Sequence, residues 1–169
     1  VLNTDISIVA VGTPSSNTGH LNLDFIFAVA RNIATVLKEK TSFHIIAIRS
    51  TVLPGTARKI TDLIESLSGK IDNVDFAVVS NPEFLREGIA VQDYYNPPLT
   101  LIGTSSQKAA FIMSSIYDYL PCEIVVTDNE VAEIMKYVNN SFHALKVSFA
   151  NEIGNICQAL KIDSHKVMD

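Results

Sequence analysis

Short apolar runs alternate with longer amphipathic stretches along this chain, and this alternation limits the folds that the chain can adopt. Five apolar, partly β-branched runs predict strands at residues 6–11, 44–48, 76–79, 100–102 and 123–126. Apolar residues at helical spacing predict helices at residues 23–40, 56–67 and 106–120. Strands joined by helices of this length form parallel βαβ units, so we expect an α/β fold with a doubly wound parallel sheet.

The strongest helical pattern covers residues 127–160. Apolar residues recur there at steps of three and four, and they form one continuous stripe: Val131, Ile134, Val138, Phe142, Leu145, Phe149, Ile153, Ile156 and Leu160. A helix of this length is about three times the average for globular proteins. Part of it is therefore expected to pack against something outside the domain, and dimerisation is the simplest interpretation.

Composition and charge exclude several classes of partner. The 169 residues carry a net charge of -5, and no stretch gathers Lys and Arg, which argues against a nucleic-acid binder. No apolar run is long enough for a membrane span. Cys122 and Cys157 lie far apart without a CxxC or Cys/His cluster, so neither a disulfide framework nor a metal site is predicted. A reducing, cytoplasmic setting fits this cysteine usage best.

The segment at residues 81–87 follows a predicted strand almost directly. Asn81 is a favourable N-cap, Pro82 suits the first helical position, and Glu83 suits the positive end of a helix, so we expect a helix to begin here. Glu83 and Glu87 would then share one helix face. Two like charges held together indicate a site, although a well-capped, solvated helix face is the alternative.

A polar face on the long helix is a second candidate. Lys136, Asn140, His143 and Asn151 fall within about a quarter turn of one another, opposite the apolar stripe. Asn and His are poor choices for solubility alone, so these four side chains could serve one ligand. A solvated face remains the alternative.

Two loops follow the first two predicted strands, at residues 11–14 and 49–52. In open parallel sheets ligands bind at the carboxyl ends of the strands, and small hydroxyl residues and Gly let a ligand approach the backbone closely. Ordinary turn chemistry explains either loop equally well. The segment at residues 81–87 reaches the same edge, which favours a site there. The chain contains no GxGxxG, GxSxG, P-loop or HExxH motif.

Five motifs, read in order, resemble those of the UDP-glucose/GDP-mannose dehydrogenase family. They are Val11-Gly-Thr-Pro-Ser15, Arg49-Ser-Thr-Val-Leu-Pro-Gly-Thr56, Asn81-Pro-Glu-Phe-Leu-Arg-Glu87, Ala132-Glu-Ile-Met-Lys-Tyr137 and Phe149-Ala-Asn-Glu-Ile-Gly-Asn155. Together they cover nearly the whole chain. Within the family, the first motif, His143 and the segment Pro97-Pro98-Leu99-Thr100 favour GDP-mannose as the substrate, since the UDP-glucose branch usually has an Arg in that segment.

The resemblance implies an activity and a cofactor. The family oxidises the C6 alcohol of a nucleotide sugar to a carboxylate, with two NAD molecules and a cysteine that forms a thiohemiacetal and a thioester. By this resemblance Thr13, Ser50 and Thr51 contact the dinucleotide, and Glu87 lies close to the nicotinamide and the sugar.

The resemblance also implies the catalytic and substrate-binding residues. Glu83 would transfer a proton or activate water, Lys136 would stabilise an oxyanion or shuttle a proton, and Asn140 would hold a water or the sugar oxygen. Glu87 and Lys136 would also contact the substrate. His143 and Asn151 match substrate-contact positions on the helix that forms the dimer core in the family.

The chain departs from the family pattern in two places. The family begins with two further βα units that carry GxGxxG, and its nucleophile lies in a GxCxPKD-like segment; neither is present here. Neither Cys122, after Pro121, nor Cys157, on the apolar side of the long helix, matches the nucleophile. We therefore expect an internal piece of an enzyme. Residues 1–126 would be the second half of a Rossmann-like NAD-binding domain, and residues 127–169 a central connecting and dimerisation helix.

Three other interpretations stay open. They are a UDP-glucose dehydrogenase, a non-catalytic dimerisation module, and a hydrolase that uses Glu83 and Glu87 as an acid/base pair.

Overall fold

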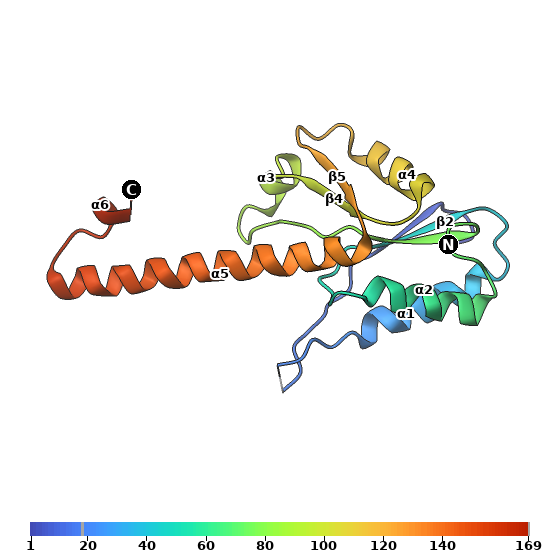
Figure 1. The fold of residues 1–169 in the computed structure, drawn as a ribbon, viewed down its shortest axis with the longest axis horizontal. Helices are drawn as coiled ribbons and strands as arrows, with labels where there is room; N and C mark the ends of the chain where they lie inside the picture. The colour runs from blue at the N-terminus through green and yellow to red at the C-terminus, as the bar shows by residue number, and fades with distance from the viewer. Residues whose placement is uncertain (18, 169) are drawn as a thin grey trace. The chain divides into compact units, whose positions relative to one another are not determined.

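The structure, a computed structural model, describes residues 1–17 and 19–168 and has the expected α/β architecture (Figure 1). In chain order the elements are β1 (Ile6–Val9), α1 (Asp24–Leu37), β2 (His44–Ile48), α2 (Thr56–Ser68), β3 (Phe76–Ser80), α3 (Ala90–Tyr95), β4 (Thr100–Gly103), α4 (Gln107–Tyr117), β5 (Ile124–Thr127), α5 (Asn129–Leu160) and α6 (His165–Met168). Each expected strand and long helix is present within a few residues of its expected bounds. The chain divides into two units, Val1–Lys136 and Tyr137–Asp169.

The first unit is built on a five-stranded sheet with the order β1-β2-β3-β4-β5. β1, β2 and β3 are parallel, and so are β4 and β5. β4, however, runs antiparallel to β3, with Ser80 opposite Gly103, so the expectation of an all-parallel sheet is wrong at this position. A parallel connection needs a crossover, usually a helix, that returns the chain to the starting edge of the sheet. The β3–β4 connection contains only the short α3, and the last residue of β4, Gly103, pairs with the last residue of β3, Ser80.

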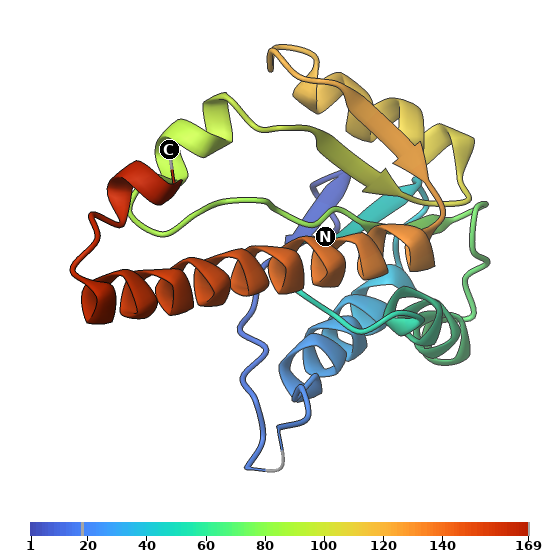
Figure 2. The same ribbon diagram turned by 60° about the vertical axis from the view of Figure 1, so that its left-hand side comes forward.

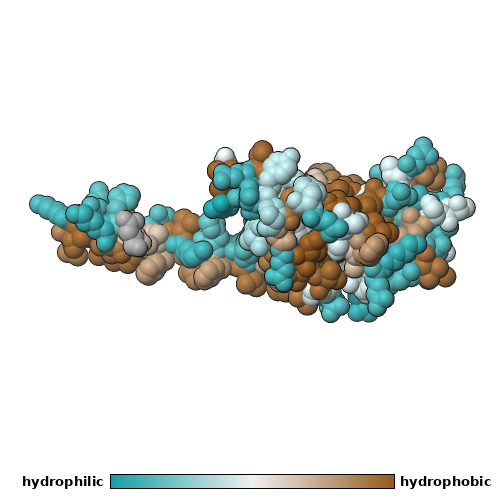
Figure 3. Space-filling view, turned by 90° about the horizontal axis from the view of Figure 1, so that it is seen from above, coloured by the Kyte–Doolittle hydropathy of each residue, from teal (hydrophilic) through white to brown (hydrophobic). Residues whose placement is uncertain are grey.

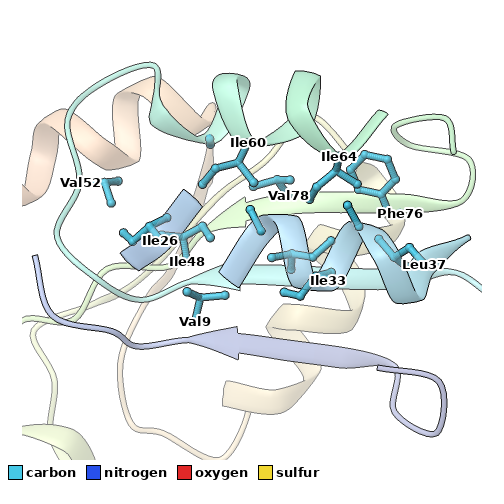
Figure 4. Close-up of a cluster of buried hydrophobic side chains, with 14 residues drawn as sticks. Val9, Ile26, Ile33, Leu37, Ile48, Val52, Ile60, Ile64, Phe76 and Val78 are labelled. Carbon is cyan, nitrogen blue, oxygen red and sulfur yellow. The ribbon is translucent and has the colours of Figure 1, made fainter. Parts of the chain in front are cut away.

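Two helix layers cover the sheet. α1 and α2 lie on one side of it and α4 on the other, as both ribbon views show (Figures 1 and 2). The larger apolar core lies between α1, α2 and strands β1 to β3, and it includes Ile33, Ile60 and Phe76 (Figure 4). All five residues of both β2 and β3 are buried. These central strands therefore give the loops at their carboxyl ends a rigid base.

The helix expected from Asn81 does not form. Residues 81–89 contain no regular secondary structure, and α3 begins only at Ala90, so Glu83 and Glu87 do not share a helix face. Asn81 is buried and its side chain is already engaged: its amide donates to the Leu101 carbonyl (2.8 Å), and its Oδ1 accepts from the Tyr117 hydroxyl (2.6 Å). An amide held by these distant groups is not available to cap a helix.

The second unit contains the rest of α5, followed by α6. Eight of the nine residues of the apolar stripe on α5 are exposed, by 42% for Val131 up to 65% for Leu145, and Figure 3 shows hydrophobic residues along this helix. The ninth residue, Ile153, is half-buried, and Cys157, which is not part of the stripe, is only 4% exposed. Within residues 1–17 and 19–168, no helix is long and apolar enough to cross a membrane.

Candidate functional site

Three loops meet at one edge of the sheet. Because β1, β2 and β3 are parallel and in register at Val9, Ile48 and Ser80, the segments that follow them leave the sheet on the same side. Hydrogen bonds join neighbouring segments. For example, the Ser50 hydroxyl donates to the Val11 carbonyl (2.6 Å), and the Asn81 backbone N–H donates to the Ile48 carbonyl (2.8 Å). The convergence expected from the sequence is therefore present in the fold.

The central feature of this edge is a buried ammonium group. The Lys136 side chain is only 6% exposed, and its Nζ lies 3.1 Å from Oε1 of Glu83. The same Nζ also donates to the Glu83 backbone carbonyl. The second carboxylate oxygen of Glu83 accepts from the Leu85 N–H (2.5 Å), which fixes the orientation of the carboxylate. Burial of a Lys next to one carboxylate gives a cation that is held in place rather than solvated.

A small cleft opens beside this pair. Its lining residues come from the ends of β2 and β3, the loop after β2 and the first turns of α5, and its empty space is about 200 Å³. They are Ile48, Ser50, Thr51, Val52, Ser80, Pro82, Glu133 and Lys136. The structure therefore brings together three of the expected site residues, Ser50, Thr51 and Lys136, around one space.

Glu133, which sequence reasoning did not single out, lies in the same cleft. It is 2% exposed, and its carboxylate accepts from the backbone N–H groups of Gly55 (2.6 Å) and Ala57 (2.8 Å). Burial raises the pKa of the Glu133 carboxyl, and these backbone hydrogen bonds oppose the rise. In the sequence, only its position three residues before Lys136 indicated that Glu133 could belong to the site. Its partners lie more than seventy residues away.

A second cleft, with about 320 Å³ of empty space, is lined in part by the segment at residues 81–85. Arg49, Asn81 and Tyr117 line it and form a hydrogen-bonded cluster, in which the Arg49 guanidinium donates to Oδ1 of Asn81 (3.0 Å). Burial raises the pKa of the Tyr117 hydroxyl. Glu83 lines this cleft too, and Pro82 lines both clefts.

The other expected site residues lie outside these two clefts. Thr13 is half-buried in the loop after β1, and Glu87 is exposed and has no hydrogen bond or ion pair with any residue that the structure describes. Asn140, His143 and Asn151 belong to the second unit, where all three are exposed on α5.

At the first cleft an ammonium group, that of Lys136, lies next to the Glu83 carboxylate. An ammonium group held at a fixed position stabilises a developing oxyanion, and a neighbouring carboxylate can take or relay a proton. Neither free cysteine in the described part of the chain lines either cleft: Cys157 is buried in the second unit, and Cys122 contacts the Thr100 hydroxyl (3.4 Å).

Comparisons with known proteins identify the family to which this sequence and fold are similar. Residues 1–121 match the family model for the NAD-binding domain of the UDP-glucose/GDP-mannose dehydrogenase family, and residues 130–169 match its central domain. The match to an NAD-binding domain confirms NAD as the expected cofactor.

Relatives and solved structures give the same result. GDP-mannose 6-dehydrogenase of Pseudomonas savastanoi pv. phaseolicola is 48% identical over 98% of this chain, and UDP-glucose 6-dehydrogenase TuaD of Bacillus subtilis is 39% identical over 98%. The crystal structure of a ternary complex of GDP-mannose dehydrogenase from Pseudomonas aeruginosa superposes with a TM-score of 0.97, at 47% identity over the whole chain. The chain spans only 38%, 35% and 39% of the lengths of these three proteins, respectively.

Proposed function

Since the chain belongs to the UDP-glucose/GDP-mannose dehydrogenase family, we propose that the native protein carrying it is an NAD-dependent nucleotide-sugar 6-dehydrogenase. It oxidises the C6 alcohol of the sugar to a carboxylate. The observation that carries this proposal is the buried Lys136 ammonium, paired with Glu83 beside Thr51 in a domain of the NAD-binding type.

The preferred substrate in this proposal is GDP-mannose, and the product is GDP-mannuronate. Support comes from the higher identity to GDP-mannose 6-dehydrogenases, 46–48%, than to the UDP-glucose 6-dehydrogenase of Bacillus subtilis, 39%. Pro97 to Thr100 and His143, which favoured GDP-mannose in the sequence, support the same choice. UDP-glucose is the alternative substrate.

The proposal assigns a role to each site residue in the first unit. Lys136 stabilises the oxyanion that develops at C6 and contacts the substrate, and Glu83 takes part in proton transfer or water activation. Thr13, Ser50 and Thr51 contact the dinucleotide.

The exposed candidates have roles that rest on the family resemblance. Glu87 contacts both the nicotinamide and the sugar, and Asn140 holds a water or the sugar oxygen. His143 and Asn151 contact the substrate. Each of these four side chains is exposed and can therefore accept a ligand.

The proposal also covers the organisation of the chain. Residues 1–126 are part of an NAD-binding domain, and residues 127–169 are a connecting and dimerisation helix. Residues 1–169 by themselves do not complete the reaction, because they contain neither the GxGxxG motif nor the GxCxPKD-like nucleophile segment of the family pattern. The two free thiols are compatible with a reducing cytoplasm.

A role in dimerisation is the second function that a specific observation favours. The apolar stripe of α5 is exposed along most of its length, which is costly for a monomer in water. We propose that a second copy of the native protein covers it.

Initial rates of NADH formation test the substrate assignment. The native protein is assayed with GDP-mannose and with UDP-glucose at equal concentrations, and residues 1–169 are assayed alongside. We expect the native protein to prefer GDP-mannose and residues 1–169 to be inactive. A native protein that prefers UDP-glucose contradicts the substrate, and turnover by residues 1–169 contradicts the claim that they are insufficient.

A further inference from the structure

Helix α2 begins without a cap from its own sequence. Its N-cap residue is Gly55, which has no side chain and adopts a left-handed backbone conformation with φ of 84°. The next residue, Thr56, has a hydroxyl, but this group donates to the Leu53 carbonyl (2.6 Å). The first N–H groups of α2 therefore need an acceptor from elsewhere.

Glu133 supplies this acceptor from α5. Its two carboxylate oxygens are divided between two donors: Oε2 accepts from the Gly55 N–H and Oε1 from the Ala57 N–H. A negative charge at this position also suits the positive end of α2. Oε1 lies 3.5 Å from the Ser80 hydroxyl at the end of β3. One side chain thus connects α5, the start of α2 and the end of β3.

These contacts hold one end of a loop that lines the cleft. Residues 50–54 run from the end of β2 to Gly55, and this loop contributes Ser50, Thr51 and Val52 to the lining of the cleft. Its β2 end is held by the bond from Ser50 to the Val11 carbonyl. Its α2 end is held by the bonds to Glu133. Lys136, one turn further along α5, has its own partner in Glu83 and does not depend on Glu133 for its contacts.

We propose that Glu133 is a positioning residue that fixes the loop at residues 50–54 for contact with the dinucleotide. This inference rests on the proposed function, in which Ser50 and Thr51 bind NAD. The proposal predicts that loss of the Glu133 carboxylate weakens the binding of NAD and leaves the contacts of Lys136 with the nucleotide sugar unchanged.

The test compares Glu133→Gln with wild type in the native protein. A Gln side chain has one acceptor oxygen, so only one of the two N–H groups keeps its partner. We expect the Kd for NAD, measured by calorimetry without substrate, to rise about tenfold, as the loss of one charge-assisted hydrogen bond implies. The kcat/KM for NAD falls by a similar factor, while the KM for the nucleotide sugar stays within about twofold.

Two controls separate positioning from loss of stability. Glu130→Gln removes the same charge from an exposed position in the first turn of α5. Ile60 is a fully buried residue of α2 that does not line the cleft. Ile60→Val removes one methylene from the core and is expected to lower stability without changing the lining of the cleft. Both controls should bind NAD as wild type does. If Glu133→Gln binds NAD no more weakly than Ile60→Val, the proposal is wrong.

Glu133→Asp is the second variant. It keeps the charge, but it is one methylene shorter and cannot reach both donors, so we expect its Kd for NAD to rise by about fivefold or more. If Glu133→Asp binds NAD with wild-type affinity, the proposal is wrong. This result decides the question even if Glu133→Gln does not fold. A wild-type protein that binds NAD but oxidises no nucleotide sugar contradicts the proposed function alone, because NAD affinity still reports on Glu133.

Discussion

At the scale of single residues, the proposed chemistry of this chain centres on Lys136. Its ammonium group is removed from water and has two acceptors, both from Glu83. Desolvation of a charge is costly, and neither Lys136 nor Glu83 belongs to the two clusters of buried hydrophobic side chains. In our proposal, the pair therefore acts on a ligand.

Replacement of Lys136 tests this interpretation. Lys136→Met keeps most of the side-chain volume but removes the charge, and we expect kcat of the native protein for nucleotide-sugar oxidation to fall by about 10²- to 10³-fold. The exposed Lys59 on α2 offers a matched control, Lys59→Met, which should keep wild-type kcat. A kcat of Lys136→Met within about threefold of wild type would remove Lys136 from the mechanism.

Residue types and spacing predicted some of the residues that line the candidate cleft. Lys136, Ser50 and Thr51 do line one cleft, because strand ends and helix faces follow from local periodicity. Glu133 was missed, since its partners Gly55 and Ala57 are distant in sequence and offer only backbone atoms. Backbone donors leave no signature in a sequence, so a contact of this kind is visible only in the fold.

At the scale of elements, helices were predictable and the connection after β3 was not. α1, α2 and α4 follow from amphipathic periodicity, and Ser106 caps α4 through the Ala109 N–H, as a local motif can. The expected helix at Asn81 failed because Arg49, Leu101 and Tyr117 all bond the Asn81 side chain. The direction of β4 likewise depends on long-range pairing rather than on local preference.

The end of β4 packs closely against the start of α5, and this contact requires a glycine at position 103. A Cβ added at Gly103 would stand 2.5 Å from Cβ of Ala132 and 3.0 Å from backbone atoms of Asp128 and Asn129. Only glycine lets the first turn of α5 approach the end of β4 this closely. The approach matters for the site because this turn also carries Glu133.

Substitution of Gly103 is therefore expected to destabilise the fold. Gly103→Ala should lower the free energy of unfolding by about 1–3 kcal/mol, as overpacking of a tight contact does, in urea denaturation. Gly12→Ala is the control, since a Cβ at Gly12 meets nothing within 4 Å, and it should change stability by less than about 0.5 kcal/mol. Equal effects of the two substitutions would contradict the account of this contact.

At the scale of the whole molecule, the exposed stripe on α5 determines assembly in our proposal. Phe142 and Phe149 are 59% and 60% exposed, and they lie seven residues apart on the same side of the helix. Aromatic residues in this position are costly to leave in water and are typical of the centres of interfaces.

Two added charges on the stripe should separate the copies. We expect the native protein to sediment as a dimer or higher oligomer, and the double variant Phe142→Glu with Phe149→Glu to sediment as a monomer. Asn155→Glu with Gln158→Glu adds the same charge to exposed positions outside the stripe and should leave the oligomer intact. A monomeric wild type, or an unchanged oligomer in the first double variant, would rule out the stripe as the interface.

The stoichiometry of the reaction tests the central claim, that this chain is part of a nucleotide-sugar 6-dehydrogenase. Oxidation of an alcohol to a carboxylate transfers two hydrides and takes up one water, so each sugar consumed must reduce two NAD molecules. Limiting GDP-mannose is incubated with the native protein and excess NAD, and NADH and the sugar product are quantified. We predict two NADH and one carboxylate per GDP-mannose. One NADH with an aldehyde product, or no NADH with any nucleotide sugar, would contradict the account.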